Sequence, residues 1–331
     1  MKIFLLCISL IFSLTTLASN VGTVIKKQGK AELLSDPSKN ITGTGKKVLY
    51  EGTYYTLKKV RPGTKIKNGN ILRTGSKSKV KIVYKNGDQF NIGEGTAYQI
   101  NWKKGKSTEE NKASSVNLIY GSLRGIISKK GPRNTLRVKS KNAVMGVRGT
   151  DFHFNQRGTS GETSISVLRG KVDVSEVEKP EKIVNVQQGF SAEIKKETVK
   201  KVTKGKTKKK ILSTFELVKT TKNELVEIQK SSKIIEKQED KTKEVSVTKE
   251  IKELEKQAIK VTMDDIKEYQ PKVYNELKGK DIQSVDTVNT VVVTQAFEKA
   301  PAKKTKKGFD ELDIDLKDDA YKKYFKIDEK I

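Results

Sequence analysis

Cysteine is nearly absent from this sequence. The 331 residues contain one cysteine, Cys7, and it lies in a segment that we expect to be removed on export. The mature chain would then have no disulfide, no thiolate nucleophile and no thiolate metal ligand. Its fold must rest on a hydrophobic core, for which a domain of roughly 170 residues is large enough.

Histidine is equally scarce, which restricts the chemistry that the chain can perform. His153 is the only histidine, so neither a nitrogen and sulfur ligand set for a metal nor a clear Ser-His pair is present. The chain also lacks a phosphate-binding loop and a dinucleotide fingerprint, and its carboxylates are too scattered for a glycosidase. The sequence therefore predicts a non-enzymatic protein with no cofactor and no bound metal.

Long apolar runs are missing except at the N-terminus. Lys2 precedes an apolar run from Ile3 to Leu14, and the small residues up to Ala18 suit cleavage after that position. The run is well short of the roughly 20 residues of a membrane-spanning helix. We predict that residues 1–18 are a cleavable signal peptide, and that the mature protein is periplasmic or secreted and does not span a membrane.

Acidic residues are heavily outnumbered. The chain has 68 lysines and arginines against 40 acids, for a formal net charge of +28, and roughly three quarters of this excess lies before residue 197. Such a charge attracts acidic partners. Outside the cytoplasm these are lipopolysaccharide, acidic glycans and anionic lipids, so we expect no nucleic acid. The alternative is that the lysines serve solubility alone.

Residues 21–196 have the pattern of a mainly β domain. Val80-Lys-Ile-Val-Tyr84 alternates apolar and polar residues, and Asn86-Gly87 follows it. Asn-Gly between alternating runs is the strongest local hairpin signal. Short strands at close spacing without helical stretches predict an antiparallel β-sandwich or a barrel-like stack.

The character of the sequence changes after residue 196. Residues 197–214 are lysine-rich and are predicted to be a solvated linker, and residues 215–260 have loosely helical apolar spacing. Residues 261–331 are polar with few aromatics, which predicts a largely disordered tail. Within this tail, 291–294 is a short β-prone run. The alternating segment Phe309–Leu316 suits docking as an added strand, with its apolar residues toward a partner, namely Leu312, Ile314 and Leu316.

Several motifs of the β domain occur in the order found in the FecR domain. They include Gly69-Asn-Ile-Leu-Arg-Thr-Gly75, Tyr120-Gly-Ser-Leu-Arg124, Gly146-Val-Arg-Gly-Thr-Asp-Phe152 and Val167-Leu-Arg-Gly-Lys-Val172. Residues 21–194 thus resemble the FecR domain, the periplasmic module of iron-uptake regulators. The resemblance implies a β architecture and a role in protein or ligand interaction. A signal peptide stands where regulatory members carry a cytoplasmic helical segment and a transmembrane helix, so anti-sigma activity is not implied.

The candidate residues of the β domain have competing interpretations. The motif residues Gly146, Arg148, Gly149, Thr150, Asp151 and Phe152 either shape a bend, with Arg148 paired to Asp151, or expose those two side chains for binding. His153 alternates with two phenylalanines, which predicts a structural position on the opposite strand face. Trp102 beside Lys103 and Lys104 could stack on sugar rings or bases, or could be a core or edge residue.

These observations favour a stand-alone FecR-like interaction or sensing module of the cell envelope. The alternative is a basic envelope protein that binds polyanions, such as lipopolysaccharide or acidic glycan, through its lysines and arginines. Binding to a linear polyanion should weaken steeply with salt, whereas a specific protein contact should persist. The partner is expected to be an envelope protein or an acidic glycan or lipid.

Overall fold

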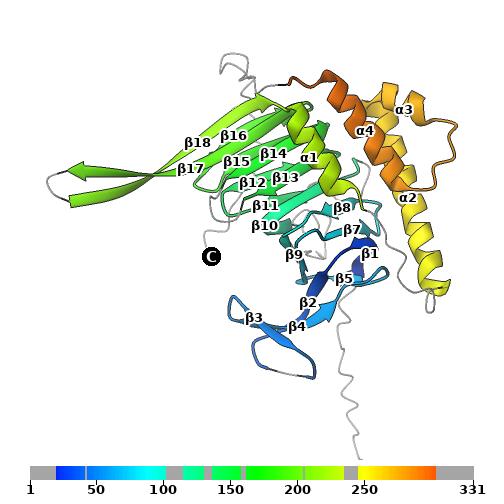
Figure 1. Ribbon diagram of the computed structural model, residues 1–331, viewed down its shortest axis with the longest axis horizontal. Helices are drawn as coiled ribbons and strands as arrows, with labels where there is room; N and C mark the ends of the chain where they lie inside the picture. Colours follow the sequence, from blue (N-terminus) through cyan, green and yellow to red (C-terminus); the bar gives the residue numbers. More distant parts are fainter. Residues whose placement is uncertain are drawn as a thin grey trace, which may run out of the picture.

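The structure is a computed structural model. It describes residues 20–41, 43–101, 115–129, 136–157, 162–203, 206–234 and 245–302, and within these ranges residues 197–212 and 245–247 are described by their backbone alone. The described residues form 18 strands and four helices, arranged as shown in Figure 1.

The strands of the first half are β1 (Asn20–Gln28), β2 (Ala31–Ser38), β3 (Lys47–Tyr50), β4 (Thr53–Lys59), β5 (Lys65–Lys67), β6 (Ile71–Thr74), β7 (Lys79–Tyr84), β8 (Gln89–Ile92) and β9 (Ala97–Asn101). The later strands are β10 (Ser115–Ile126), β11 (Leu136–Lys139), β12 (Ala143–Val147), β13 (Asp151–Gln156), β14 (Thr163–Arg169), β15 (Lys171–Glu176), β16 (Lys179–Gln187), β17 (Phe190–Thr203) and β18 (Lys206–Lys219).

The strands pair into two sheets that share β10. Sheet A has the order β5-β1-β7-β8-β10-β13-β14-β17-β18. Sheet B has the order β3-β4-β2-β6-β9-β10-β11-β12-β15-β16. The β10–β11 pair is parallel, and the other pairings among the described strands are antiparallel. The mainly β prediction is therefore confirmed, with one parallel pair that the sequence pattern did not predict.

A glycine lets β10 pass from one sheet to the other. Residues 115–120 of β10 pair with β9 in sheet B, and residues 121–126 pair with β13 in sheet A. Gly121, at the corner, has φ +93°, and a Cβ there would lie 2.5 Å from the Cα of Thr96. No side chain fits at that distance, so the corner requires glycine.

The main hydrophobic core lies between the two sheets. Alternating residues of each strand point into it, as in β13, where Phe152 and Phe154 are both fully buried in the core. Tyr84 packs edge-on against Phe90, with ring centroids 5.4 Å apart, and its hydroxyl lies 3.1 Å from that of Tyr98. The core thus needs no disulfide.

Four helices cover the other side of sheet A. They are α1 (Lys222–Ser232), α2 (Val245–Tyr269), α3 (Pro271–Leu277) and α4 (Val285–Lys299), and Figure 1 shows them gathered at one flank of the strands. Apolar residues of α1, α2 and α4 pack with Leu168 of β14, and Ala258 and Val285 pack with Ile25 and Val83. No helix among the described residues combines the length and apolar character needed to cross a membrane.

The prediction of a disordered chain from residue 261 is wrong for residues 261–299. These residues form the end of α2 and all of α3 and α4, because their apolar side chains find partners on each other and on sheet A. The β-prone run at 291–294 is helical. Val285, Val288, Val292 and Val293 recur at helical spacing and are buried together. The predicted helical segment at 215–260 begins instead at Lys222, where Thr221 and Glu224 form a capping box.

The predicted linker at 197–214 is also wrong for the described residues. Strands β17 and β18 pair across this region in continuous antiparallel register. The lysines there are interspersed with valine, threonine and isoleucine, the β-branched residues that favour strands. The prediction of a linker relied on the high lysine content and overlooked these β-branched residues.

Candidate functional site

The motif Gly146–Phe152 forms the passage from sheet B to sheet A. Gly146 lies in β12 and Asp151 begins β13. Between them, Gly149 has φ +65°, and a Cβ there would lie 2.7 Å from the Cβ of Lys129. The second glycine of the motif is therefore required by both the backbone conformation and the close approach of a neighbouring segment.

The other motif residues divide between the interior and the surface. Thr150, Asp151 and Phe152 are buried, whereas Arg148 is exposed at the turn. The interpretation that Arg148 pairs with Asp151 is wrong, because Asp151 is buried and pairs with Arg124. Of the two motif residues considered for exposure at a binding surface, Arg148 and Asp151, only Arg148 is accessible.

Arg124 and Asp151 form a buried ion pair on the outer side of sheet A. The Nε of Arg124 donates to Oδ1 of Asp151 at 2.8 Å and its Nη2 donates to Oδ2 at 2.7 Å, with each side chain 1% exposed. Arg124 Nη2 also donates to the carbonyl of Asn289 in α4 at 3.3 Å. This two-pronged geometry is the strongest form of an arginine–carboxylate contact, and it joins two strands to the helices.

Three more basic residues of sheet A are matched by acids of the helices. Lys81, which is 0% exposed, pairs with Asp286 of α4. Lys26 lies 3.0 Å from Asp286 and 3.3 Å from Glu255 of α2. The third of these residues, Arg169, pairs with Asp265 of α2 and is described below. We refer to these basic residues together with Arg124 as the covered face of sheet A, namely Lys26, Lys81, Arg124 and Arg169.

The pKa values on the covered face follow from burial and pairing. Burial would raise the pKa of Asp286, but Lys81 and Lys26 outweigh it and bring the pKa below its usual value. Burial lowers the pKa of Lys81 although Asp286 opposes the shift. For Lys26, the two acids overcome the effect of burial and raise the pKa. Asp286 is therefore the anion on which two lysines of sheet A depend.

Arg169 is less well matched than Arg124. It contacts Asp265 of α2 at 3.5 Å with both side chains buried, and its Nε and Nη1 have no hydrogen-bond partner among the described residues. Burial lowers the pKa of Arg169 and raises that of Asp265. The cost of burying these two charges is therefore less fully offset here than in the Arg124–Asp151 pair.

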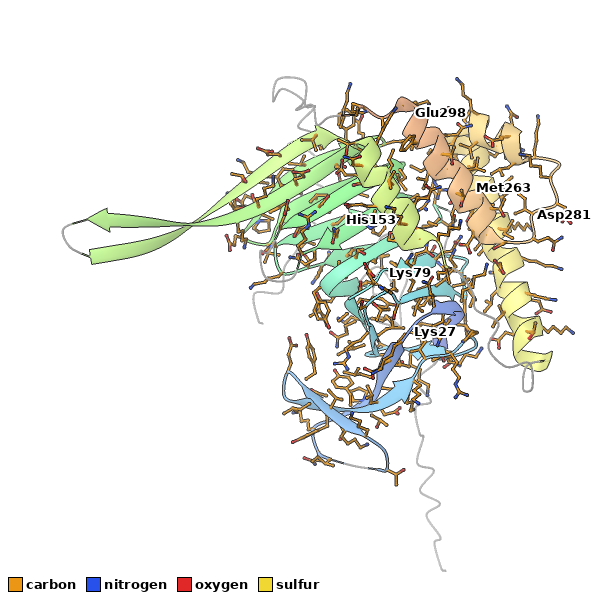
Figure 2. All side chains as sticks on the ribbon, in the orientation of Figure 1. Lys27, Lys79, His153, Met263, Asp281 and Glu298 are labelled. Atoms are coloured by element: carbon orange, nitrogen blue, oxygen red, sulfur yellow. The ribbon has the colours of Figure 1, made fainter. Side chains whose placement is uncertain are left out.

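His153 lies on the covered side of sheet A, as the alternation with Phe152 and Phe154 predicts. Figure 2 shows it among the strands, whereas Asp281 and Glu298 lie at the outside of the helices. It is 7% exposed, and its Nε2 has no hydrogen-bond partner among the described residues. Burial, followed by the charge of Arg124, lowers the pKa of His153 to about 4. The imidazole is therefore neutral at pH 7.

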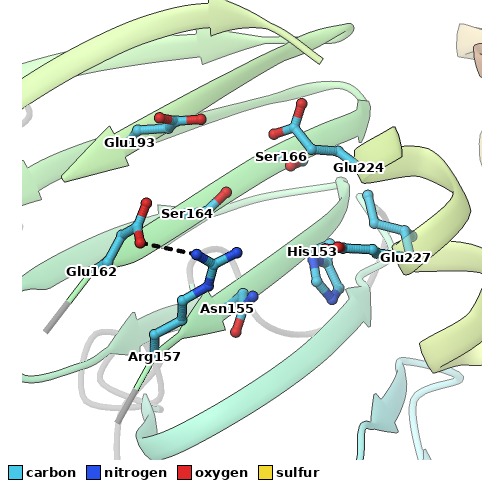
Figure 3. A pocket seen from close by; sticks show the side chains of 10 residues that line it. His153, Asn155, Arg157, Glu162, Ser164, Ser166, Glu193, Glu224 and Glu227 are labelled. Atoms are coloured by element: carbon cyan, nitrogen blue, oxygen red, sulfur yellow. Dashed lines mark hydrogen bonds and ion pairs between the residues drawn. The ribbon is translucent and has the colours of Figure 1, made fainter. Parts of the chain in front are cut away.

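A small polar cavity opens between His153 and α1. It has a volume of about 100 Å³, and Figure 3 shows four glutamates, two serines, Asn155 and Arg157 around it. Two of the four glutamates have a cationic neighbour: Arg157 pairs with Glu162 at 3.0 Å, and Glu193 lies 3.4 Å from Lys195. No group of three or more potential metal ligands is present among the described residues. The cavity is a small polar gap between sheet A and α1.

The remaining sequence-based candidates lie outside the described residues. They are the aromatic and basic cluster Trp102, Lys103 and Lys104 and the tail residues Leu312, Ile314 and Leu316. Both assignments stay predictions.

Residues 70–173 match the model of the FecR protein family. The chain contains a FecR domain. The match runs from the start of β6 into β15, so the FecR domain includes the corner in β10, the motif between β12 and β13, and the Arg124–Asp151 pair.

Among solved structures, two crystal structures of one protein are similar to the chain. They come from Parabacteroides distasonis ATCC 8503, were determined at 1.65 Å and 2.50 Å resolution, and are provisionally assigned as an anti-sigma factor. The identity is 14% and the TM-score 0.33, over 44% of this chain and 58% of that one. The chain thus spans less than two thirds of that protein, and this similarity carries no functional argument. No curated protein matches the chain.

Most of the covered face was not predicted from the sequence. Lys81 lies between Val80 and Ile82 in a strand, where a polar residue is expected to face solvent. Asp265 and Asp286 lie in the part predicted to be disordered. The one available signal was the occurrence of arginine in otherwise apolar strand segments, as at Arg169 after Val167-Leu168.

Proposed function

We propose that this protein is a non-enzymatic regulatory or sensing module of the cell envelope that works by binding a protein partner. The observation that carries the proposal is the FecR match over β6–β15. The internal use of the charged groups supports it, since Arg124 pairs with Asp151 and Lys81 pairs with Asp286 within the fold. These groups stabilise the arrangement of strands and helices and are not placed to act on a substrate.

Export is part of this proposal and has its own test. Residues 1–18 act as a signal peptide, so the mature protein should begin at Ser19 and fractionate outside the cytoplasm. N-terminal sequencing of the protein recovered from its native cell measures this directly. An intact Met1 together with a cytoplasmic fraction would contradict the export proposal but would leave the binding proposal intact.

The partner is tested with the full mature chain in intact envelopes. Cross-linking followed by affinity capture at about 150 mM and about 500 mM salt separates the two kinds of contact, because charge-only binding falls steeply with salt. We expect one protein partner to persist at the higher salt. An Arg148→Ala variant should lower its recovery if the exposed turn after β12 is part of the interface. Recovery of no protein at either salt would contradict the proposal.

The second candidate function is binding of an envelope polyanion. The charge of +28 favours it, and so does the arrangement of the lysines in β17 and β18. In the capture experiment it predicts an anionic polymer that is recovered at low salt and lost at high salt.

A further inference from the structure

The two longest described strands form an arm. Only residues 191–194 of β17 pair with β14, and along its length β18 pairs with β17 among the described strands. Residues 195–203 and 206–214 therefore make a two-stranded ribbon, which we call the arm. Figure 1 shows it projecting from the rest of the molecule. Nine residues per strand give a length of roughly 30 Å.

The arm concentrates the positive charge of the C-terminal part. Residues 197–214 have a formal charge of +6, and the whole of residues 197–331 also has +6. The helices and the tail are thus neutral together. The distribution argues against lysines spread only for solubility, because the longer C-terminal part has no excess of them.

Like charges oppose each other across the arm. Lys200 is the register partner of Lys209, and Lys201 is that of Lys208. Such pairs destabilise a sheet, and a two-stranded ribbon is only marginally stable in water.

Among the side chains that the structure describes, lysines of the arm meet acids at its base. There Lys195 lies 3.4 Å from Glu193 and Lys196 lies 2.7 Å from Glu178. In the sequence of the arm beyond this point, Glu197 is the only acid up to residue 214. An external anion would relieve the repulsion between lysines that are register partners.

The backbone places this charge on both faces of the arm. Because successive residues alternate between faces, Lys200 and Lys209 share one face and Lys201 and Lys208 share the other. A flat membrane meets only one face, and interfacial segments usually carry aromatic anchors. Residues 195–214 contain no aromatic residue and no arginine. This composition also lacks the stacking groups with which proteins bind single-stranded nucleic acid.

We propose that the arm binds a flexible acidic polysaccharide, whose carboxylate or sulfate groups contact lysines on both faces. The lysine ammonium is a point charge without the planar fork of the arginine guanidinium. The arm should therefore select a polysaccharide by the spacing of its negative charges more than by the shape of each anionic group. This proposal rests on the second candidate function and assigns it a location and a ligand class.

The test uses the full mature chain with two probes, a heparin fragment with sulfates and polygalacturonate with carboxylates. The arm variant changes Lys200, Lys201, Lys208 and Lys209 to Gln. The control variant changes four exposed lysines elsewhere to Gln and so loses the same charge, at Lys39, Lys182, Lys272 and Lys280. Dissociation constants are measured by calorimetry from about 50 to about 300 mM NaCl.

We expect the arm variant to lose affinity by about 10-fold or more at low salt, and the control by no more than about 3-fold. The slope of log K against log salt should fall by about 3 in the arm variant, at roughly 0.7 per lost contact as for single-stranded polyanions. Replacing the four arm lysines with Arg should preserve binding, since the charge remains.

Each contrary result has a distinct meaning. Equal losses in both glutamine variants would overturn the role of the arm while leaving polyanion binding in place. Preference for duplex DNA or for phosphatidylglycerol vesicles over both polysaccharides would overturn the ligand class. Failure of the wild-type chain to bind any of these probes would overturn the second candidate function as well. The regulatory proposal is unaffected, since salt-resistant protein capture tests it separately.

Discussion

The covered face of sheet A and the arm are both rich in cations, but the neighbours of those cations differ between the two regions. On the covered face, Lys81 is fully buried beside Asp286, and Arg124 is buried beside Asp151. In the arm, Lys200 lies opposite Lys209, and the sequence offers a single acid nearby. The covered face brings cations next to acids from distant parts of the chain, whereas the arm brings lysine opposite lysine.

Lysine can therefore contribute to folding in one region and be available for binding in another. A buried charge without a partner costs several kcal/mol, so the covered face must be matched for the chain to fold. A solvated lysine costs little, and repulsion across an exposed ribbon is worth about 0.2 to 1 kcal/mol per pair. The fold can therefore tolerate unmatched lysines in the arm and nowhere beneath the helices.

The largest expected effect comes from breaking the match beneath the helices. Asp151→Ala leaves Arg124 buried without its carboxylate and should lower the free energy of unfolding by about 3 to 5 kcal/mol. Urea unfolding of the full chain measures this. Glu181→Ala, at an exposed position in β16, is the control and should change stability by less than about 0.5 kcal/mol. Similar losses of unfolding free energy in both variants would mean that the buried Arg124–Asp151 pair contributes no more to stability than an exposed residue.

The next effect is a pH dependence that isolates His153. Its pKa is about 4 in the folded protein against 6.5 for an ordinary histidine, so below pH 6.5 the unfolded chain binds a proton that the folded chain does not. Stability should therefore fall by about 3 kcal/mol as the pH drops from 7 to 4. The pKa of Asp265 is raised in the folded protein, so protonation of Asp265 favours the folded chain and offsets part of this loss at the lowest pH values.

The measurement is urea unfolding at several pH values, compared with His153→Gln. The variant should lose most of the slope between pH 6.5 and pH 4.5, because no other histidine is present. An unchanged slope would show that His153 takes up its proton equally well in the folded and unfolded chains.

A smaller effect should follow from Asp286→Asn, which removes the anion shared by Lys81 and Lys26. We expect a loss of about 2 to 3 kcal/mol, less than for Asp151, because the Asp286 side chain is 26% exposed and Glu255 remains near Lys26. Hydrogen exchange should rise in α4 and in β7. Glu298→Gln, exposed in the same helix, serves as the control. Protection of α4 equal to wild type would indicate that the apolar contacts alone dock the helices.

The smallest effect belongs to the arm. Lys209→Glu places an acid opposite Lys200 and should stabilise the ribbon by about 0.5 kcal/mol, seen as slower hydrogen exchange at residues 198–212. Lys182→Glu, exposed in β16, should leave exchange in the arm unchanged. Faster exchange in the Lys209→Glu variant would contradict the repulsion that the pairing implies.

Prediction from the sequence succeeded where local rules apply. Alternation in 80–84 and the Asn-Gly turn predict β7 and the hairpin to β8, and the structure has both. The position of His153 opposite two core phenylalanines follows from the same period of two. Prediction failed where long-range contacts decide the outcome, as in α4, whose valines form a helix because α2 and sheet A bury them.

The β class, the FecR-like motifs and the scarcity of cysteine and histidine can all be read from the sequence alone. The matching of charges is a property of the folded chain, since Asp286 meets Lys81 across 205 positions of the chain. The tertiary structure also decided that a lysine run forms a ribbon rather than a linker, because strand pairing depends on the register between two segments. The physical reason is common to both: composition and period are local properties, whereas burial and pairing depend on residues far apart in the sequence.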